Sequence, residues 1–343
     1  MKPEQAESLF IQELFSQSQQ RGHAIGETLE LVDKLTGDAS TRRYYRLFTN
    51  KASYVVCLDN PQEDASLPHP FVSKQKFLEA NGLRVTRVLD AQLNKGYILE
   101  EDLGDMTLLS FLTNLKDVKE EYVTYEKIIM QLIQMHKLDE VKTKNSGLFD
   151  LKFDHEKLMQ EMDFTFKFFF ERYLKVIDHE KEKILREELS VICHRIANQP
   201  MVPTHRDFHS RNIMVKDGEM VIIDFQDARM GLPQYDLVSV LDDCYYDLVE
   251  DNREKLKKLY FEKLPVSAHG QGSYAEFCDY YDDMLIQRVF KAVGSFSYIY
   301  ATRQDLRYLK YIGFGMEKIR KTLMHNPRYE NLRKNLFGIY YAS

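Results

Sequence analysis

Residues 204–228 read THRDFHSRNIMVKDGEMVIIDFQDA, in which two short polar blocks flank two apolar runs. An Asp-Gly pair lies between the runs NIMV and MVII, which is a strong signal for a β-hairpin. The hairpin brings Asn212 and Asp224 back to one open end, and Asp207 is close enough to reach the same place from a loop. With a strict two-residue turn, Asn212 and Asp224 point to opposite faces. If both bind one ion, the turn must be longer or bulged, or strand pairing must stop before them.

The residue types in this stretch suit one kind of chemistry. Carboxylate and amide oxygens are hard ligands of the kind that Mg²⁺ prefers when it bridges nucleotide phosphates. Phosphoryl transfer needs a carboxylate that orients the attacking hydroxyl, and ligands for the metal that neutralises phosphate charge. The set Asp207, Asn212 and Asp224 therefore predicts a magnesium-dependent phosphotransferase site.

Composition excludes several other classes of protein. The chain has 343 residues, of which 44% are apolar and 29% charged, as in an ordinary globular protein. No apolar run reaches the length of a bilayer span, and the opening MKPEQAESLF is too polar for a signal peptide, so we expect a cytoplasmic protein without a membrane partner. The four cysteines are scattered and form no zinc motif. A net charge of −6 without a basic stripe argues against nucleic acid, and no obligate protein partner is evident.

The chain changes character near Gly104. Residues 31–60 read as an antiparallel meander, a helix follows over 71–82, and RVTRVLDAQ and KGYILEEDLG are two further strands. Beyond Gly104 long amphipathic helices dominate, beginning with EEYVTYEKIIMQLIQMHKL. We expect an α+β fold of two lobes: a small antiparallel-sheet N-lobe over 1–103 and a larger, mainly helical C-lobe over 104–343.

Here the sequence resembles a known family. HRDFHSRN is similar to the kinase catalytic loop H-R-D-x-x-x-x-N, and IIDFQ stands where protein kinases carry D-F-G. The helix-rich C-terminal part resembles the aminoglycoside phosphotransferase-like branch of the protein-kinase-like fold. Within that branch, GDASTRRYYR, GYILEEDLG, HRDFHSRNIMV, YDLVSVLDDCYYD and QRVFKAVGSF resemble the bacterial cell-wall amino-sugar anomeric kinases. The resemblance covers about residues 30–315.

The resemblance implies a role for each residue of the opening stretch. It makes Asp207 the catalytic base, and Asn212 and Asp224 the Mg²⁺ ligands, with ATP as the phosphoryl donor. The connector over 99–103, which contains Glu100 and Asp102, would offer groups to adenine. Asp236 is expected to anchor the catalytic loop without reacting.

Two departures from kinases concern the phosphates of ATP. There is no G-x-G-x-x-G motif, so Ser40, Thr41 and the following arginines are expected to supply donors. Cys57 stands where a kinase has its phosphate-binding Lys, and Phe71 stands near the place of the Glu partner. Arg42 or Arg43, or less favourably Arg46, is the predicted substitute. Because side chains alternate along a strand, Arg42 and Arg46 point to one face of the sheet and Arg43 points to the other. The arginines of only one face can therefore bind the phosphates of ATP. A nucleotide-binding pseudokinase could show the same losses.

The acceptor implied by the resemblance is the anomeric hydroxyl of N-acetylmuramate or N-acetylglucosamine. A muramic substrate carries a lactyl carboxylate, for which Arg288, Lys291 and Arg211 are candidate partners. The alternative for Arg288 and Lys291 is a pair of surface charges on an amphipathic helix. Acidic residues such as Asp243 are a candidate contact for the substrate, and an acidic cleft would also suit an aminoglycoside. A choline-type kinase would need an aromatic cage.

Overall fold

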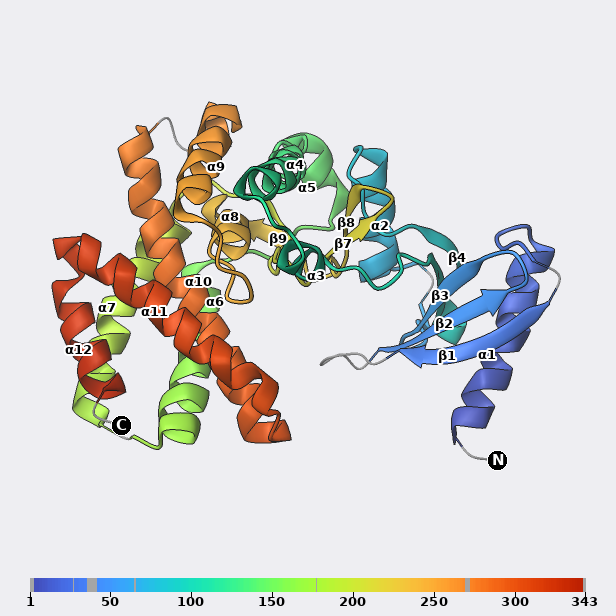
Figure 1. The fold of residues 1–343 in the computed structure, drawn as a ribbon, viewed down its shortest axis with the longest axis horizontal. Coiled ribbons are helices and arrows are strands. Elements are labelled where there is room, and N and C mark those ends of the chain that lie inside the picture. Colours follow the sequence, from blue (N-terminus) through green and yellow to red (C-terminus); the bar gives the residue numbers. More distant parts are fainter. Residues whose placement is uncertain are drawn as a thin grey trace. The chain divides into compact units, whose positions relative to one another are not determined.

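The structure is a computed structural model that describes residues 3–26, 28–35, 42–64, 66–176, 178–268 and 272–341. The chain forms two compact units, one over Met1–Met106 and Met214–Gln226 and the other over Thr107–Ile213 and Asp227–Ser343. The strand-rich unit and the mostly helical unit are coloured blue to teal and green to red in Figure 1, apart from the yellow hairpin segment of the first unit. The α+β fold class is thus the one predicted.

The first unit is built on an antiparallel sheet of five strands in the order β1-β2-β3-β5-β4. Its strands are β1 (Leu29–Leu35), β2 (Arg43–Thr49), β3 (Ser53–Leu58), β4 (Val88–Gln92) and β5 (Tyr97–Glu101). A short 3₁₀ turn over Leu93–Lys95 joins β4 to β5. The meander and the two later strands predicted from the sequence are confirmed.

One face of this sheet is covered by α1 (Pro3–Gln20), as Figure 1 shows. Side chains that alternate along the strands pack against the helix: Tyr45, Leu47, Val56, Leu58 and Leu99 meet Ile11, Leu14 and Phe15. Because strand side chains alternate between faces, Tyr44, Cys57 and Glu100 belong to the opposite face. The core of the unit therefore lies on one side of the sheet.

The predicted hairpin is also part of the first unit. β7 (Ile213–Lys216) and β8 (Glu219–Ile222) are joined by Asp217 and Gly218, both at positive φ. Asn212 and Asp224 both lie outside the strands of the hairpin, so strand pairing stops before them. Next to the hairpin, α2 (Pro70–Ala80) ends before Gly82, as predicted, and Phe71 stacks on Phe225 with ring centroids 5.0 Å apart.

The second unit is mainly helical. Its helices are α3 (Leu108–Thr113), α4 (Val118–His136), α5 (Glu140–Ser146), α6 (His155–Thr165), α7 (His179–Ala197), α8 (Gln234–Leu241), α9 (Glu250–Lys263), α10 (Tyr274–Arg303), α11 (Leu309–His325) and α12 (Glu330–Tyr340). A π-helix over Phe166–Leu174 continues α6 and buries Phe166, Phe169 and Phe170. No helix within the described ranges is both long and apolar enough to cross a bilayer.

Two short strands position the predicted catalytic loop in the second unit. β6 (Val202–Thr204) pairs antiparallel with β9 (Arg229–Gly231), and the loop over 205–212 leaves β6 directly. α8 and the long α10 pack against each other. Residues from both helices line the cavity in which Asp207 lies.

Candidate active site

The loop over 205–212 is held by a buried carboxylate, as expected for Asp236. The backbone N–H groups of His205 and Arg206 donate to the two oxygens of Asp236, at 2.6 and 3.0 Å. His136 of α4 lies 3.4 Å from the same carboxylate, and Asp236 and His136 both have fully buried side chains. Arg206 adopts φ 85°, a conformation that costs energy in a residue other than glycine. These bonds hold that strained turn, which presents Asp207.

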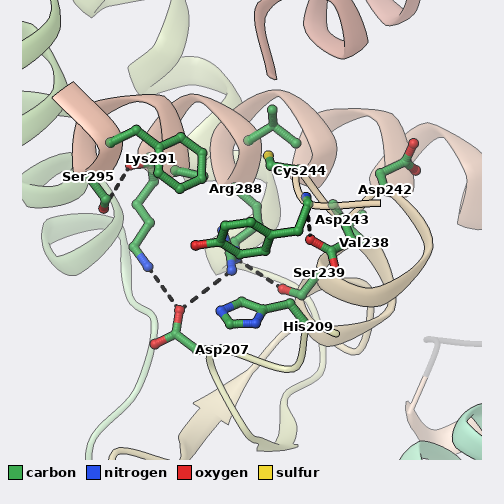
Figure 2. Close-up of a pocket in the computed structure, with 14 residues that line it drawn as sticks. Asp207, His209, Val238, Ser239, Asp242, Asp243, Cys244, Arg288, Lys291 and Ser295 are labelled. Atoms are coloured by element: carbon green, nitrogen blue, oxygen red, sulfur yellow. Dashed lines mark hydrogen bonds and ion pairs between the residues drawn. The ribbon is translucent and has the colours of Figure 1, made fainter. Parts of the chain in front are cut away.

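Asp207 lies at a cavity of about 230 Å³. The cavity is lined by Asp207, His209, Val238, Ser239, Asp242, Asp243, Cys244, Tyr245, Arg288, Val289, Lys291, Ala292, Ser295 and Phe296. These residues come from the catalytic loop, from α8 and the segment after it, and from α10. Figure 2 shows Arg288 and Lys291 extending from the α10 ribbon toward the carboxylate of Asp207.

Three cations surround the Asp207 carboxylate. Lys291 Nζ is 3.1 Å from Oδ1, Arg288 Nη2 is 3.5 Å from the same oxygen, and Arg206 Nε is 3.7 Å from Oδ2. Burial acts to raise the pKa of Asp207, but these cations outweigh it and hold the pKa well below its usual range. Asp207 is therefore a carboxylate at any physiological pH, and it is a weak base.

Arg288 is a buried cation, and Lys291 is largely covered. Only 14% of the Lys291 side chain and 7% of the Arg288 side chain are exposed. Arg288 Nε also donates to Ser239 Oγ at 3.0 Å. Burial, together with Arg288, lowers the pKa of Lys291, although Asp207 opposes this shift. The alternative of two surface charges on an amphipathic helix is wrong for Arg288, which is buried on α10, and Lys291 points its ammonium group at Asp207.

His209, which departs from the protein-kinase loop, lies in the same cavity. Its ring meets Tyr245 edge-on with centroids 5.2 Å apart. Burial lowers the pKa of His209 to about 3, and Arg288 and Lys291 add to the shift although Asp207 opposes it. His209 is thus neutral near pH 7.

The predicted metal ligands fall into different units. Asn212 belongs to the second unit, where its Nδ2 donates to the carbonyl oxygen of Asp207 at 3.0 Å. Asp224 belongs to the first unit, has φ 65°, and accepts from Gln226 Nε2 at 2.7 Å. Both present oxygen donors that suit Mg²⁺. Whether they share one ion stays a prediction.

Other predicted substrate contacts are all in the second unit. Asp243 lines the Asp207 cavity, but its two oxygens accept from the backbone N–H groups of Ser210 and Tyr245, each at 2.8 Å. Burial raises the pKa of Asp243. Arg211 lies elsewhere: its Nη1 donates to Tyr308 Oη at 3.0 Å, and it lines a second cavity. The structure therefore brings Arg288 and Asp243, but not Arg211, into the lining of the Asp207 cavity.

The first unit carries a polar group of side chains on the face of its sheet opposite α1. Tyr44 pairs with Cys57 across β2 and β3, and Arg46 pairs with Val55, which in turn faces Glu100 on β5. Burial raises the pKa of Cys57 to about 12 and that of Glu100 to about 8. Both groups are therefore mostly neutral at pH 7.

Of the three predicted arginines, Arg42 lies among this group. Its Nε donates to Asp59 Oδ2 at 2.7 Å, its guanidinium lies 5.6 Å from the Phe71 ring centroid, and its charge acts on Tyr44, Cys57 and Glu100. Phe71, predicted to stand near the place of the kinase Glu, therefore contacts Arg42 through its ring.

Arg43 and Arg46 are bound elsewhere. Arg43 contacts Glu7 of α1 at 2.9 Å, on the covered side of the sheet. Arg46 binds Asp102 and Asp105. The predicted nucleotide contact Asp102 is therefore held by Arg46, and its Oδ1 also accepts from the Gly104 N–H at 2.9 Å. Ser40 and Thr41 lie outside the described residues.

Sequence reasoning missed two features of these sites. The Lys291 to Asp207 ion pair joins residues 84 positions apart, and no local spacing could have paired them. Lys74 of α2 is buried and donates to the backbone oxygen of Gln226 at 2.6 Å. The signal for it in the sequence was its place on the predicted helix over 71–82, three residues after Phe71.

Known proteins are similar to this chain over most of its length. A relative from Neisseria meningitidis, named N-acetylmuramate/N-acetylglucosamine kinase, is 28% identical over 269 residues, covering 77% of each chain. A protein of the same name from Pseudomonas aeruginosa is 29% identical over 284 residues, covering 80% of this chain and 78% of the relative.

Solved structures show the same fold at lower identity. A choline kinase from Streptococcus pneumoniae has a TM-score of 0.59 at 15% identity, covering 93% of this chain and 98% of the other. An ADP-bound aminoglycoside phosphotransferase has a TM-score of 0.57 at 17% identity, covering 93% and 97%. The fold is therefore protein-kinase-like, as predicted. Residues 32–268 match the family described as the phosphotransferase enzyme family, and this chain belongs to that family of ATP-dependent kinases.

Proposed function

We propose that this kinase transfers the γ-phosphoryl group of ATP to the anomeric hydroxyl of an N-acetylated amino sugar, N-acetylmuramate or N-acetylglucosamine. The observation that carries the proposal is the Asp207 carboxylate, which Lys291, Arg288 and Arg206 keep ionised at a small polar cavity. The two relatives named N-acetylmuramate/N-acetylglucosamine kinase, at 28% and 29% identity, support an N-acetylated amino sugar as the acceptor.

The low pKa of Asp207 supports the choice of hydroxyl. A base with a lowered pKa removes protons poorly, so it is best matched to an acidic hydroxyl. The anomeric hydroxyl is the most acidic one of an amino sugar, because the ring oxygen withdraws electrons from C1. In this role Asp207 orients the hydroxyl and accepts its proton as the oxygen attacks phosphorus.

The charges of the cavity argue against cationic acceptors. Choline or an aminoglycoside needs carboxylates that remain available, or an aromatic cage without competing cations. Here Asp242 is bound by Tyr281 Oη at 2.5 Å and Arg253 at 3.1 Å, and Asp243 by two backbone amides. Arg288 and Lys291 add two positive charges to the lining. A neutral or anionic sugar suits this lining better than a cation does.

Asn212 and Asp224 are proposed to hold Mg²⁺, which would neutralise charge on the phosphates of ATP. Among the described residues no group of three His, Cys, Asp or Glu could hold a metal by itself. A nucleotide-bound Mg²⁺ needs only one or two protein side chains, because phosphates and waters supply its other ligands. Arg42 is the proposed cation for the phosphates, and Glu100 and Asp102 lie at the edge proposed for adenine.

A phosphorylation assay with ³¹P NMR tests the proposal. The purified protein, ATP and Mg²⁺ are incubated with N-acetylmuramate, N-acetylglucosamine, kanamycin or choline. We expect phosphate esters of the two sugars, with phosphorus coupled to the anomeric proton. Faster phosphorylation of kanamycin or choline, or a phosphate on another hydroxyl, would overturn the assignment of the acceptor.

A further inference from the structure

A second cavity of the helical unit is lined by cations. It has a volume of about 520 Å³ and is formed by Arg211, Leu306, Arg307, Tyr308, Lys310 and Tyr311. Three of these six side chains are positively charged and none is acidic. A cavity lined by one sign of charge concentrates ions of the opposite sign. The expected occupant is therefore an anionic group.

An aromatic layer separates this cavity from the Asp207 cavity. Tyr245 and Phe296 line the Asp207 cavity, whereas Tyr308 and Tyr311 line the second one. The ring centroids of Tyr245 and Tyr311 are 4.8 Å apart, and those of Phe296 and Tyr308 are 5.9 Å apart. The two cavities are thus neighbours, because the rings that line one contact the rings that line the other. Aromatic faces are also surfaces on which apolar sides of a ligand can pack.

Arg211 is oriented by this layer. Its guanidinium carbon lies 5.0 Å from the Tyr245 ring centroid and 5.6 Å from that of Tyr308, and its Nη1 donates to Tyr308 Oη at 3.0 Å. Stacking and the hydrogen bond limit the rotamers of the side chain, so little entropy remains to be lost when a ligand binds. The planar fork of a guanidinium matches the two oxygens of a carboxylate.

The cations of α10 are engaged with the proposed base. Lys291 and Arg288 contact Asp207 at 3.1 and 3.5 Å, and Arg288 also contacts Ser239. A substrate carboxylate bound by either cation would compete with Asp207 for it. Sequence analysis named Arg288, Lys291 and Arg211 as partners of a lactyl carboxylate, and the geometry distinguishes among them.

We propose that Arg211, with Lys310 in the same cavity, binds the lactyl carboxylate of N-acetylmuramate, while Arg288 and Lys291 serve Asp207. This inference rests on the proposed function. The lactyl ether is on C3 and the reacting hydroxyl on C1, so the carboxylate lies roughly one sugar ring away from the reacting atom. Arg211 lies against Tyr245, which lines the Asp207 cavity, so its guanidinium is one ring away from that lining. Arg211 is then a specificity-determining residue.

The test compares kcat/KM for the two sugars in the wild type and in Arg211→Gln. N-acetylglucosamine has no carboxylate, so it controls for effects on the catalytic loop. We expect kcat/KM for N-acetylmuramate to fall by ~10- to 100-fold and that for N-acetylglucosamine by less than ~3-fold, the range for loss of a charge-assisted pair. Arg320→Gln is the matched control. Arg320 pairs with Glu317 on α11 and belongs to the lining of neither cavity, so the ratio of the two sugars should change by less than ~2-fold.

A neutral substrate gives a second, independent measurement. The methyl ester of N-acetylmuramate should be a poor substrate for the wild type, and Arg211→Gln should weaken its use no further, because the interaction is already absent. An additional loss on the ester, or an equal loss on both sugars, would overturn the inference. A raised KM for ATP in Arg211→Gln with an unchanged ratio of sugars would instead assign the cavity to a phosphate. If the wild type phosphorylates neither sugar, the proposed function itself fails.

Discussion

Glu100 in the sheet unit and Asp207 in the helical unit are two carboxyl groups whose surroundings shift their pKa values in opposite directions. Glu100 is buried with one cation acting on it, Arg42, and burial raises its pKa to about 8. Asp207 has three cations within 4 Å, which hold its pKa well below its usual range although burial opposes them. One group is mostly neutral at pH 7 and the other is ionised.

The difference shows how the number of nearby cations decides the charge state of a buried acid. Burial disfavours the charged form of both groups, and only a sufficient local positive charge reverses this effect. A catalytic base must be ionised before it can accept a proton, so Asp207 meets this requirement. Glu100, on the face of the sheet opposite α1, can instead donate a hydrogen bond from its neutral form.

The largest effect on activity is expected when Asp207, the ionised one of the two carboxyl groups, is replaced. Asp207→Asn should lower kcat by roughly 10² to 10⁴-fold, because the hydroxyl loses the group that orients it and accepts its proton. ATP affinity, measured by nucleotide titration of the same variant, should change little, since Asp207 is proposed to face the acceptor. Unchanged kcat would show that Asp207 is not the base.

Removing one nearby cation should raise the pKa of Asp207 toward that of Glu100. Lys291→Met should lower kcat by roughly 10-fold and move the acidic limb of the pH profile of kcat/KM upward by about one pH unit, because the carboxylate loses its nearest positive charge. The sign follows from the lowered pKa: activity is lost as the pH falls through it, and a higher pKa moves that loss to higher pH. Lys291→Arg keeps the charge and is the control. A pH profile identical to that of the wild type in Lys291→Met would remove Lys291 from any role at Asp207.

Arg42 and Arg43 are adjacent in sequence and lie on opposite faces of the sheet, which makes them a matched pair. Arg42→Ala should raise KM for ATP by roughly 10-fold, because a phosphate would lose a charge-assisted partner. Arg43→Ala should leave KM for ATP unchanged, since Arg43 contacts Glu7 on the side of α1. The reverse result, or no effect at either position, would remove Arg42 from the proposed nucleotide site.

The smallest effect on activity is expected at Glu100. Because its folded pKa is raised above the ordinary value, its contribution to stability falls as the pH rises from about 4.5 to about 8. Glu100→Gln should remove this decrease in the free energy of unfolding, which is at most about 1.4 kcal/mol per pH unit. Thermal unfolding of the wild type and of the variant at pH 5, 6.5 and 8 measures the decrease. A parallel decline of Tm in the variant would show that Glu100 is already ionised in the folded protein.

Local sequence predicted the elements that depend on neighbouring residues. The Asp-Gly turn, the five strands of the sheet and the end of α2 before Gly82 were all predicted, because turn chemistry and periodicity act over a few residues. The contact of Asp236 with the loop over 205–212 was also expected, on the basis of the resemblance to kinases.

Tertiary structure decided which cations act on which carboxyl group. Strand alternation separated Arg43 from Arg42 and Arg46, but only the packing of α1 shows which face it covers. The sequence pattern of α10 could not decide whether Arg288 and Lys291 lie on the surface or in the site. Periodicity reveals the buried stripe of a helix but does not identify the residues that pack against it.

By itself, then, the sequence determined the strands of the sheet, the hairpin and the oxygen-bearing residue types of the predicted catalytic loop. The charge state of Asp207 depends on groups that lie 81 and 84 residues away along the chain. Electrostatic interactions and burial depend on distance in space, and that distance exists only once α10 has packed beside the loop.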